Sequence, residues 1–255
     1  MNITNKNNLD IYIKYSGLGD NLFYTHVPKI AKESGIEKVR VHIPENVYQS
    51  KKAELIWSLN PYVDEISMNS KKIQSPLNPS FKNLPLLDQI VHSFGLKTSE
   101  KNFEAELYYE PKKVDWLENA TIYDGNYTSG VGFVSLDKIA QTLNEKQGSK
   151  FVMKKLKGSH NHTIKLDNSK ELAASGLEEY FDFVFSVKNF YCLASGGATL
   201  RPSFRKKAVV FYGAGLFPIF KHSILNEYVD VTPPNLKSIY KASSLLYRVL
   251  RKVKP

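Results

Sequence analysis

The sequence has little of several features that would each assign a class of protein. Its single cysteine, Cys192, has no partner for an internal disulfide and leaves no cysteine-based zinc site. Its longest nearly apolar stretch, residues 208–220, is 13 residues long and interrupted by glycine and proline. A membrane-spanning helix needs ~20 apolar residues. The first ten residues also lack the apolar segment of a secretory signal. These absences predict a cytoplasmic protein without a membrane span.

Acidic residues are scarce in the last third of the chain. Residues 183–255 carry 12 lysines and arginines against Glu227 and Asp230 alone, so they hold the whole net charge of +10. An anionic partner, either a phosphorylated ligand or an acidic membrane surface, would explain this asymmetry. A basic face that only keeps the protein soluble is the alternative. Nucleic acid is not expected as a partner, because the sequence contains no motif typical of RNA or DNA binding.

What is present is an alternation of strand-like and helix-like segments, which predicts an α/β protein with parallel sheets. The predicted strands are residues 10–15, 38–43, 63–68, 103–109, 120–123, 150–156, a short one ending at Leu166, 190–194, 207–212 and 228–231. The predicted helices are a single one between residues 19 and 35, then 46–59, 85–95, 135–145 and 177–187.

A polar stretch at residues 110–119 separates two runs of this alternation. We therefore predict a first domain at residues 1–118, a second at residues 119–233, and a final basic amphipathic helix at residues 234–255. The apolar stripe of that helix is expected to pack back on the first domain. Its basic face is suited to an anionic membrane surface.

Two glycine turns stand at the ends of predicted strands, where α/β sheets bind ligands. The first turn contains Gly17, Gly19 and Asp20. It fails as a dinucleotide-binding fingerprint, because Leu22 stands where the third glycine would be needed. A carboxylate at Asp20 would suit a general base, and the alternative is an ordinary acidic cap of the following helix.

The second turn, residues 195–199 (SGGAT), follows an apolar strand and opens a helix. Its two glycines allow close backbone approach, its hydroxyls are donors, and a helix N-terminus favours an anion. We expect a phosphate here, and a β-branched side chain at Gly197 to crowd it. A tight turn with a serine cap is the alternative.

These segments together resemble a known family. Residues 15–35 (YSGLGDNLFYTHVPKIAKESG), NPYVDEI, HSFGL and residues 176–213 (GLEEYFDFVFSVKNFYCLASGGATLRPSFRKKAVVFYG) are similar, in the same order, to segments of glycosyltransferase family 9, the ADP-heptose:lipopolysaccharide heptosyltransferases. The resemblance implies a GT-B fold, in which two Rossmann-like domains face each other across a cleft. The first domain of this fold binds the acceptor and the second binds the nucleotide-sugar donor.

The resemblance also implies roles for particular residues, without a metal or cofactor. Asp20 is the implied catalytic base of an inverting transfer. The residues assigned to the donor are Ser195, Gly196, Gly197, Ala198, Thr199, Arg201, Asp124 and Asn126, and those assigned to the acceptor are Gly19, Asn21 and His26. Arg201, Arg205 and Lys188 are the candidates for neutralising the leaving diphosphate. For His26, packing in the core is the alternative.

This chain departs from the family pattern at Ala194, where the family has aspartate, at Thr199, where it has histidine, and at residues 131–133, where a Lys-x-Trp element is expected. We predict a hexosyl- or heptosyltransferase that acts on a bacterial cell-surface glycan, either the lipopolysaccharide or lipooligosaccharide core or a capsule. Its acceptor would be lipid-linked or phosphorylated, at the inner face of the inner membrane. Because of the departures, a non-catalytic protein of the same fold that binds nucleotide-sugar or glycan is the alternative.

Overall fold

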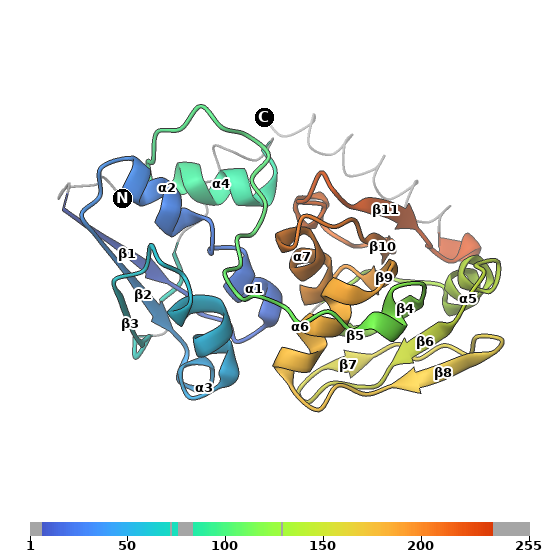
Figure 1. Ribbon diagram of the computed structural model, residues 1–255. Coiled ribbons are helices and arrows are strands. Elements are labelled where there is room, and N and C mark those ends of the chain that lie inside the picture. The colour runs from blue at the N-terminus through green and yellow to red at the C-terminus, as the bar shows by residue number, and fades with distance from the viewer. Residues whose placement is uncertain (1–6, 72, 76–83, 129, 237–255) are drawn as a thin grey trace, which may run out of the picture.

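The protein is described here from a computed structural model, in which residues 7–71, 73–75, 84–128 and 130–236 are described. Two α/β units follow each other along the chain, and each is built on its own parallel sheet (Figure 1). The helix α1 of the first unit lies at the junction, beside α7 of the second unit.

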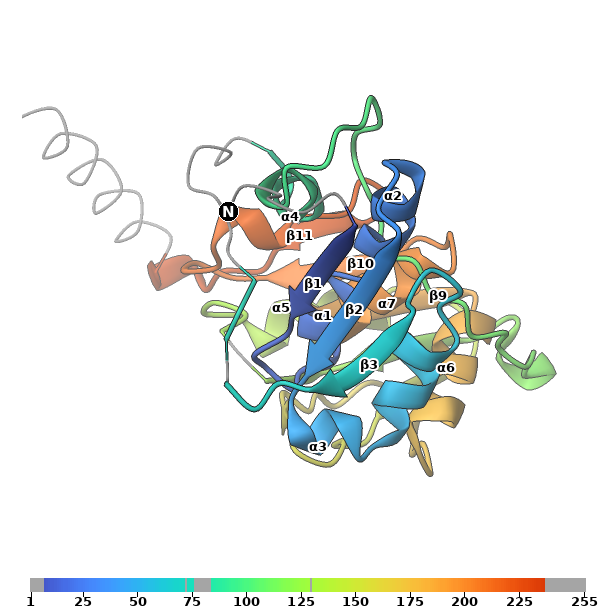
Figure 2. The ribbon, with the colours of Figure 1, turned by 90° about the vertical axis from the view of Figure 1, so that its left-hand side faces the viewer.

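The first unit contains a sheet of three parallel strands, in the order β1 (Asn8–Tyr12), β2 (Lys38–Ile43) and β3 (Glu65–Met68). One face of this sheet is turned toward the viewer in Figure 2, and none of the described helices lies over it. Its other face packs toward the second unit. The helical segments of this unit are α1 (Leu18–Leu22), α2 (Val27–Glu33), α3 (Glu45–Tyr48), the π-helical η1 (Ala53–Ser58) and α4 (Leu86–Ser93).

Alternation along the strands explains the two faces of this sheet. Val39, Val41 and Ile43 of β2 are fully buried against the helices. Arg40 lies on the other face, where its guanidinium donates to both carboxylate oxygens of Asp10 at 2.8 and 2.9 Å. The uncovered face is therefore polar, which is compatible with its exposure to water.

The second unit contains a sheet of six parallel strands in the order β11-β10-β9-β4-β6-β8. The chain runs outward from β4 to β8, then returns to the other side of β4 and continues outward to β11, which is the doubly wound topology of Rossmann-like sheets. The strand bounds are β4 (Thr121–Asp124), β6 (Lys150–Met153), β8 (Ser169–Leu172), β9 (Asn189–Leu193), β10 (Val209–Tyr212) and β11 (Glu227–Asp230).

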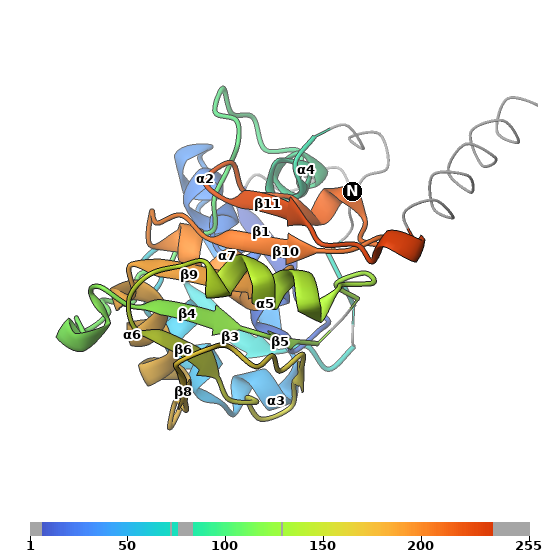
Figure 3. The same cartoon turned by 90° about the vertical axis from the view of Figure 1, so that its right-hand side faces the viewer.

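Helices cover both faces of this second sheet. Helix α5 (Leu136–Asn144) lies on the outer face, in front of the strands in Figure 3. Helices α6 (Leu177–Ser186) and α7 (Gly196–Ser203) lie on the face toward the first unit. The short elements are the antiparallel pair β5 (Asn126–Tyr127) and β7 (His160–Asn161), and the 3₁₀ turns η3 (Asp115–Leu117) and η4 (Pro218–Phe220).

One apolar core extends through both units. It contains Ile11 and Val41 of the first sheet together with Phe181 of α6 and Phe190 of β9. A smaller core lies under α5 and includes Ile139. Because the larger core is continuous across the junction, the two units pack directly on each other.

Most of the predicted elements are confirmed within a few residues, but the single helix predicted after the first turn is wrong. The structure has two helices there, α1 and α2, separated by residues 23–26. Pro28 lies in the first turn of α2. A proline has no N–H to donate, and its ring would collide with the carbonyl of Tyr24 if the first helix continued. The helix predicted at residues 46–59 is likewise divided, into α3 and η1.

Two strand predictions are also corrected. Residues 103–109 are not a strand, because backbone N–H groups there bond to side chains: Phe103 N to Asp88 Oδ2 at 3.2 Å, and Glu106 N to Thr25 Oγ1 at 3.0 Å. The strand predicted to end at Leu166 is replaced by β8 a few residues later. Leu172 is the one buried residue of β8, so this edge strand has no apolar alternation to reveal it.

The predicted boundary at residues 118 and 119 falls between η3 and β4 and stays a prediction. Of the predicted final helix, residues 237–255 lie outside the described residues. In the part of the chain that the structure describes, no helix is both long and apolar enough to cross a membrane.

Candidate functional site

A cavity of about 80 Å³ lies where the N-termini of α1 and α7 meet. It is lined by both units, and its described lining residues are Gly19, Asp20, Phe23, Thr128, Gly130, Ala194, Ser195, Gly196, Ala198, Phe220 and His222. The structure thus brings the two glycine turns of the sequence, some 180 residues apart in the chain, to one place.

The first turn is held by a buried asparagine. Asn21 Nδ2 donates to Gly17 O at 2.8 Å, and Asn21 Oδ1 accepts from Trp57 Nε1 at 3.1 Å. Gly17 is the N-cap of α1 and has an extended backbone. Asn21 is fully buried and does not line the cavity. Its side chain therefore shapes the turn that presents Asp20, rather than facing the cavity as the acceptor assignment required.

Asp20 lies in the first turn of α1, with its carboxylate folded back over Gly17. A Cβ atom at Gly17 would collide with Asp20 Oδ2, so only glycine leaves room for this conformation. Burial raises the pKa of Asp20, while a hydrogen bond from its own backbone N–H and the charge of Lys52 act in the opposite direction. The carboxylate is therefore a stronger base than an exposed aspartate, which is the property that a general base needs.

The second turn follows β9. Ser195 is the N-cap of α7 and has an extended backbone, and the helix begins at Gly196. Ser195 Oγ is buried and has no hydrogen-bond partner among the described residues. A buried hydroxyl without a partner costs about 1–3 kcal/mol, and such groups in native proteins usually have a bound water, ion or ligand as their partner.

The backbones of the two turns touch through glycines. A Cβ atom at Gly19 would lie 3.5 Å from Gly196 Cα, and one at Gly196 would lie 2.9 Å from Leu18 Cβ. The N-terminus of α7, which carries partial positive charge and has no acidic residue in its first turn, therefore lies at this small cavity. Such a helix end favours an anion.

Asp124 and Asn126 lie under the second turn and do not line the cavity. Both are buried. Asp124 Oδ2 accepts from Tyr180 Oη at 2.6 Å, and Asp124 Oδ1 accepts from Asn126 N at 2.9 Å. Asn126 Nδ2 in turn donates to Lys154 O at 3.0 Å. These two residues stand where the strand order reverses, between β4 and β9, and they support the turn instead of facing a ligand.

The contacts of Gly197 indicate a role in core packing rather than in phosphate binding. A Cβ atom there would lie 3.0 Å from Tyr180 Oη, 3.2 Å from Phe190 Cζ and 3.3 Å from Asp124 Oδ2, so it points into the core and not toward a phosphate. We expect Gly197→Val to lower the free energy of unfolding by about 1–3 kcal/mol through overpacking. Chemical denaturation measures this change. A stable variant that only binds diphosphate more weakly would support the crowding of phosphate that the sequence predicts.

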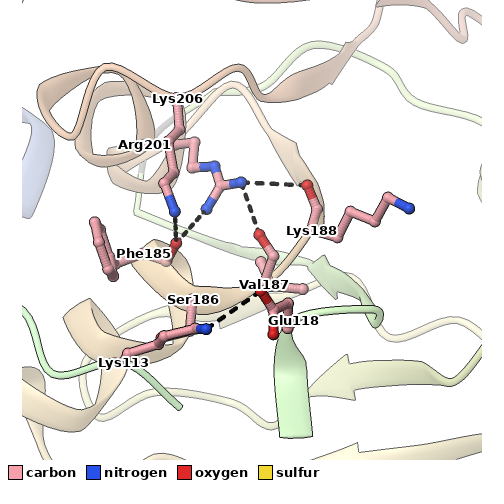
Figure 4. Close-up of a pocket in the computed structure, with 8 residues that line it drawn as sticks. All are labelled: Lys113, Glu118, Phe185, Ser186, Val187, Lys188, Arg201 and Lys206. Atoms are coloured by element: carbon pink, nitrogen blue, oxygen red, sulfur yellow. Dashed lines mark hydrogen bonds and ion pairs between the residues drawn. The ribbon is translucent and has the colours of Figure 1, made fainter. Parts of the chain in front are cut away.

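Arg201 does not line the cavity between α1 and α7. It lies beside a second cavity, where its guanidinium is directed at backbone carbonyl groups (Figure 4). Its guanidinium is almost fully buried against the end of α6. Its carbonyl partners are Val184, Phe185 at 3.0 Å, Val187 at 2.8 Å, Lys188 at 3.3 Å and Lys207 at 3.3 Å. Burial lowers the pKa of Arg201 to about 10, so it stays charged at neutral pH. It stabilises the C-terminus of α6, whose carbonyl groups carry partial negative charge.

The other two cations expected near the leaving group are also absent from the lining of the cavity. Lys188 precedes β9 and borders a separate, open cavity of about 420 Å³ next to Arg201, whereas the second turn lies beyond the other end of β9. Arg205 follows the C-terminus of α7, away from its N-terminus.

His26 is a core residue in this structure. Its Nε2 lies 3.2 Å from Leu87 O, its ring stacks on Phe103, and burial lowers its pKa to about 4. Thr199 is buried in the first turns of α7, with Oγ1 3.2 Å from His222 Nε2. In the described residues, no three His, Cys, Asp or Glu side chains are grouped as a metal site requires.

Sequence reasoning missed several residues that line the cavity, namely Phe23, Gly130, Phe220 and His222, whereas Thr128 is expected there because it follows the first strand of the second unit. His222 matters most among them, because it is buried beside the second turn and packs edge-on against Phe23, the residue after α1, with ring centroids 5.1 Å apart. No local sequence pattern marks His222, because two of its contacts, Thr199 and Phe23, lie 23 and 199 residues earlier in the chain. The signal arises only when the two units pack together.

Solved structures with a similar fold include several glycosyltransferases. A glycosyl transferase family 9 protein from Veillonella parvula superposes with a TM-score of 0.60 and 9% sequence identity, over 93% of this chain and 89% of that one. The E. coli ADP-heptose lipopolysaccharide heptosyltransferase II gives 0.59 and 10%, over 86% and 89%. The E. coli heptosyltransferase WaaC with ADP gives 0.53 and 10%, over 91% and 99%.

No protein-family model and no curated protein sequence matches the chain. At the identities of these structural neighbours, the likeness shows the fold alone. The predicted fold class, α/β with two Rossmann-like units facing each other as in GT-B glycosyltransferases, is thereby confirmed.

Proposed function

We propose that this protein is a glycosyltransferase that moves a sugar from a nucleoside diphosphate donor to an acceptor hydroxyl. The observation that carries the proposal is that Asp20 and the N-terminus of α7 line one cavity from two different units. A half-buried carboxylate with a raised pKa thus lies beside a helix N-terminus, which favours an anion. The solved structures that resemble this chain, which include a family 9 glycosyltransferase and two heptosyltransferases, support the same reaction class.

In this reaction, Asp20 takes the proton of the acceptor hydroxyl while that oxygen forms a bond to the anomeric carbon of the donor sugar. The bond from the anomeric carbon to the diphosphate oxygen breaks, and the electron pair leaves with the nucleoside diphosphate. Attack opposite to the leaving group inverts the anomeric configuration. The backbone N–H groups at the start of α7 and the unpartnered Ser195 hydroxyl stabilise the negative charge of the leaving group.

The size of the cavity adds a requirement to the proposal. Sites for whole small-molecule ligands have volumes of about 300–1,000 Å³, whereas this cavity has about 80 Å³, enough for a phosphate-sized group. The glycine contact between α1 and α7 therefore has to open before a nucleotide-sugar enters. On this proposal, the arrangement is a closed form in which Asp20 and the N-terminus of α7 lie together.

The finer assignments are part of the same proposal. The sugar is a hexose or heptose, and the acceptor is a lipid-linked or phosphorylated glycan of the bacterial cell surface, in the lipopolysaccharide core or a capsule. The net charge of +10, which lies wholly in residues 183–255, supports an anionic acceptor and peripheral contact with the inner face of the inner membrane.

A donor panel tests the proposal. The protein is incubated with ADP-, GDP-, UDP-, CDP- and dTDP-sugars and with a lipid-linked glycan extract, and release of nucleoside diphosphate is measured. We expect release with one donor that depends on the acceptor extract and on Asp20. Tight binding of one donor without any release would contradict the transfer reaction and favour the non-catalytic binding protein, for which the alanine at position 194 argues.

A further inference from the structure

A leaving diphosphate needs positive charge, and the cavity offers one source of it. Among the described residues that line the cavity, His222 is the only side chain that can carry a positive charge. The remaining lining residues are glycines, aromatics, small or hydroxyl side chains, and Asp20 itself. The nearest arginine on α7, Arg201, has its guanidinium committed to carbonyl oxygens at the end of α6.

The contacts of His222 fix its tautomer and its orientation. Its Nδ1 lies 3.1 Å from Phe220 O, and because a carbonyl oxygen can only accept, Nδ1 carries the hydrogen. Its Nε2 lies 3.2 Å from Thr199 Oγ1 and is therefore the acceptor of the threonine hydroxyl hydrogen. The ring thus presents Nε2 to the first turns of α7, close to where an anion would bind.

We propose that His222 is a catalytic residue that takes up a proton at Nε2 when the donor binds and donates a hydrogen bond from that atom to the diphosphate. This inference rests on the proposed function, because the diphosphate belongs to the proposed donor. In the occupied site, the Thr199 hydroxyl turns from Nε2 toward the same anion or toward its own helix. The protonated ring and the helix end then share the charge of the leaving group.

The surroundings of His222 are compatible with the uptake of a proton at Nε2. Burial lowers the pKa of His222 to about 4, so the ring is neutral at physiological pH. The ionisable groups near it are Asp20 across the cavity, Glu104, which accepts from the Ser223 hydroxyl at 2.7 Å, and Tyr228, whose hydroxyl accepts from Ser223 N at 3.1 Å. A diphosphate in the cavity adds negative charge close to Nε2 and raises the pKa of His222.

Binding of inorganic pyrophosphate to the whole chain tests the inference without knowledge of the donor. The histidine ring signals are followed by NMR from pH 4 to pH 8, with and without pyrophosphate, and the titration of His222 is expected to move upward by at least ~3 pH units, from about 4 to near neutral pH. By linkage, the affinity of wild-type protein for pyrophosphate then rises as the pH falls through the new pKa of His222 toward its old value of about 4. No change in the His222 titration on saturation with pyrophosphate would overturn the inference.

Two variants separate the titration of His222 from the titration of pyrophosphate itself, which is the same for the wild-type protein and for both variants. His222→Gln is expected to lose at least ~10-fold in pyrophosphate affinity at pH 6 and to show only the pH dependence of the ligand. His26→Gln is the matched control, because His26 is equally buried, has its pKa lowered to the same value of about 4, and does not line the cavity. Equal pH dependence in both variants would contradict the assignment.

The outcomes distinguish this inference from the proposed function. Pyrophosphate binding that shifts His222, together with no turnover of any donor, would support the inference and contradict the transfer reaction. Turnover of a donor with an unshifted His222 would support the transfer reaction and overturn the inference. The titration of the wild-type protein needs no substitution, so it tests the role of His222 even if the His222 variant is unstable.

Discussion

Replacement of Asp20 by asparagine is expected to lower turnover by at least ~100-fold while donor binding stays within about twofold. An asparagine side chain has the size of aspartate but cannot accept the proton of the acceptor hydroxyl. The side chain would still fit over Gly17, since the space there accommodates a planar group of this shape. Steady-state rates with the donor identified by the panel, and donor affinity by calorimetry, measure the two effects separately.

The stability of Asp20→Asn distinguishes a base from a helix cap. Burial raises the pKa of Asp20, so the folded protein binds the proton more tightly than the unfolded chain does, and ionisation at neutral pH costs stability. We therefore expect the melting temperature of the variant at pH 7 to be unchanged or higher. A variant that retains nearly wild-type turnover but melts lower would show that Asp20 only caps α1.

The pH dependence of wild-type turnover follows from the same shift. The base must be ionised, so activity falls as the pH falls through the pKa of Asp20. Because that pKa is raised, the acid limb is expected at higher pH than an exposed aspartate would give. Lys52 opposes the shift, and its ammonium donates to Ser16 O at 2.6 Å in the turn beside Asp20.

The sequence predicts the regular parts of this fold because local pattern and tertiary environment agree there. The alternation in residues 38–43 matches one buried and one polar face of β2, and the apolar run at residues 190–194 matches β9 in the centre of the second sheet. The prediction fails where tertiary contacts, rather than the local pattern, determine the backbone structure. Residues 103–109 have strand-like composition, but Asp88 and Thr25 capture their N–H groups.

The two glycine turns of the candidate site can be recognised in the sequence, but the directions of its side chains cannot. Gly197 and Arg201 stand four residues apart on α7, and therefore lie on one face of the helix. Gly197 faces Tyr180 and Phe190 in the core, so Arg201 faces α6 as well. That geometry becomes visible only once the packing of α7 is known. His222 illustrates the converse, because a loop with no motif places it beside Thr199.

Replacement of Arg201 by methionine is expected to lower the free energy of unfolding by about 3 kcal/mol or more. Methionine fills part of the space but leaves the carbonyl groups of Val184, Phe185 and Val187 without the guanidinium that now bonds them. Arg201→Lys should recover only part of the loss, because an ammonium cannot reproduce the planar fork of the guanidinium. Chemical denaturation of the purified variants gives the difference directly.

Lys206→Met is the matched control for this prediction. Lys206 donates to the same Phe185 carbonyl at 2.7 Å, but it is half-buried, so water can replace its ammonium. A loss below about 1 kcal/mol is expected for that variant. Arg201→Met, at a temperature where it is folded, should bind pyrophosphate as tightly as wild-type protein does, because Arg201 does not line the cavity between α1 and α7. A large loss of pyrophosphate affinity with little loss of stability would instead place Arg201 in the donor site and contradict its role at the end of α6.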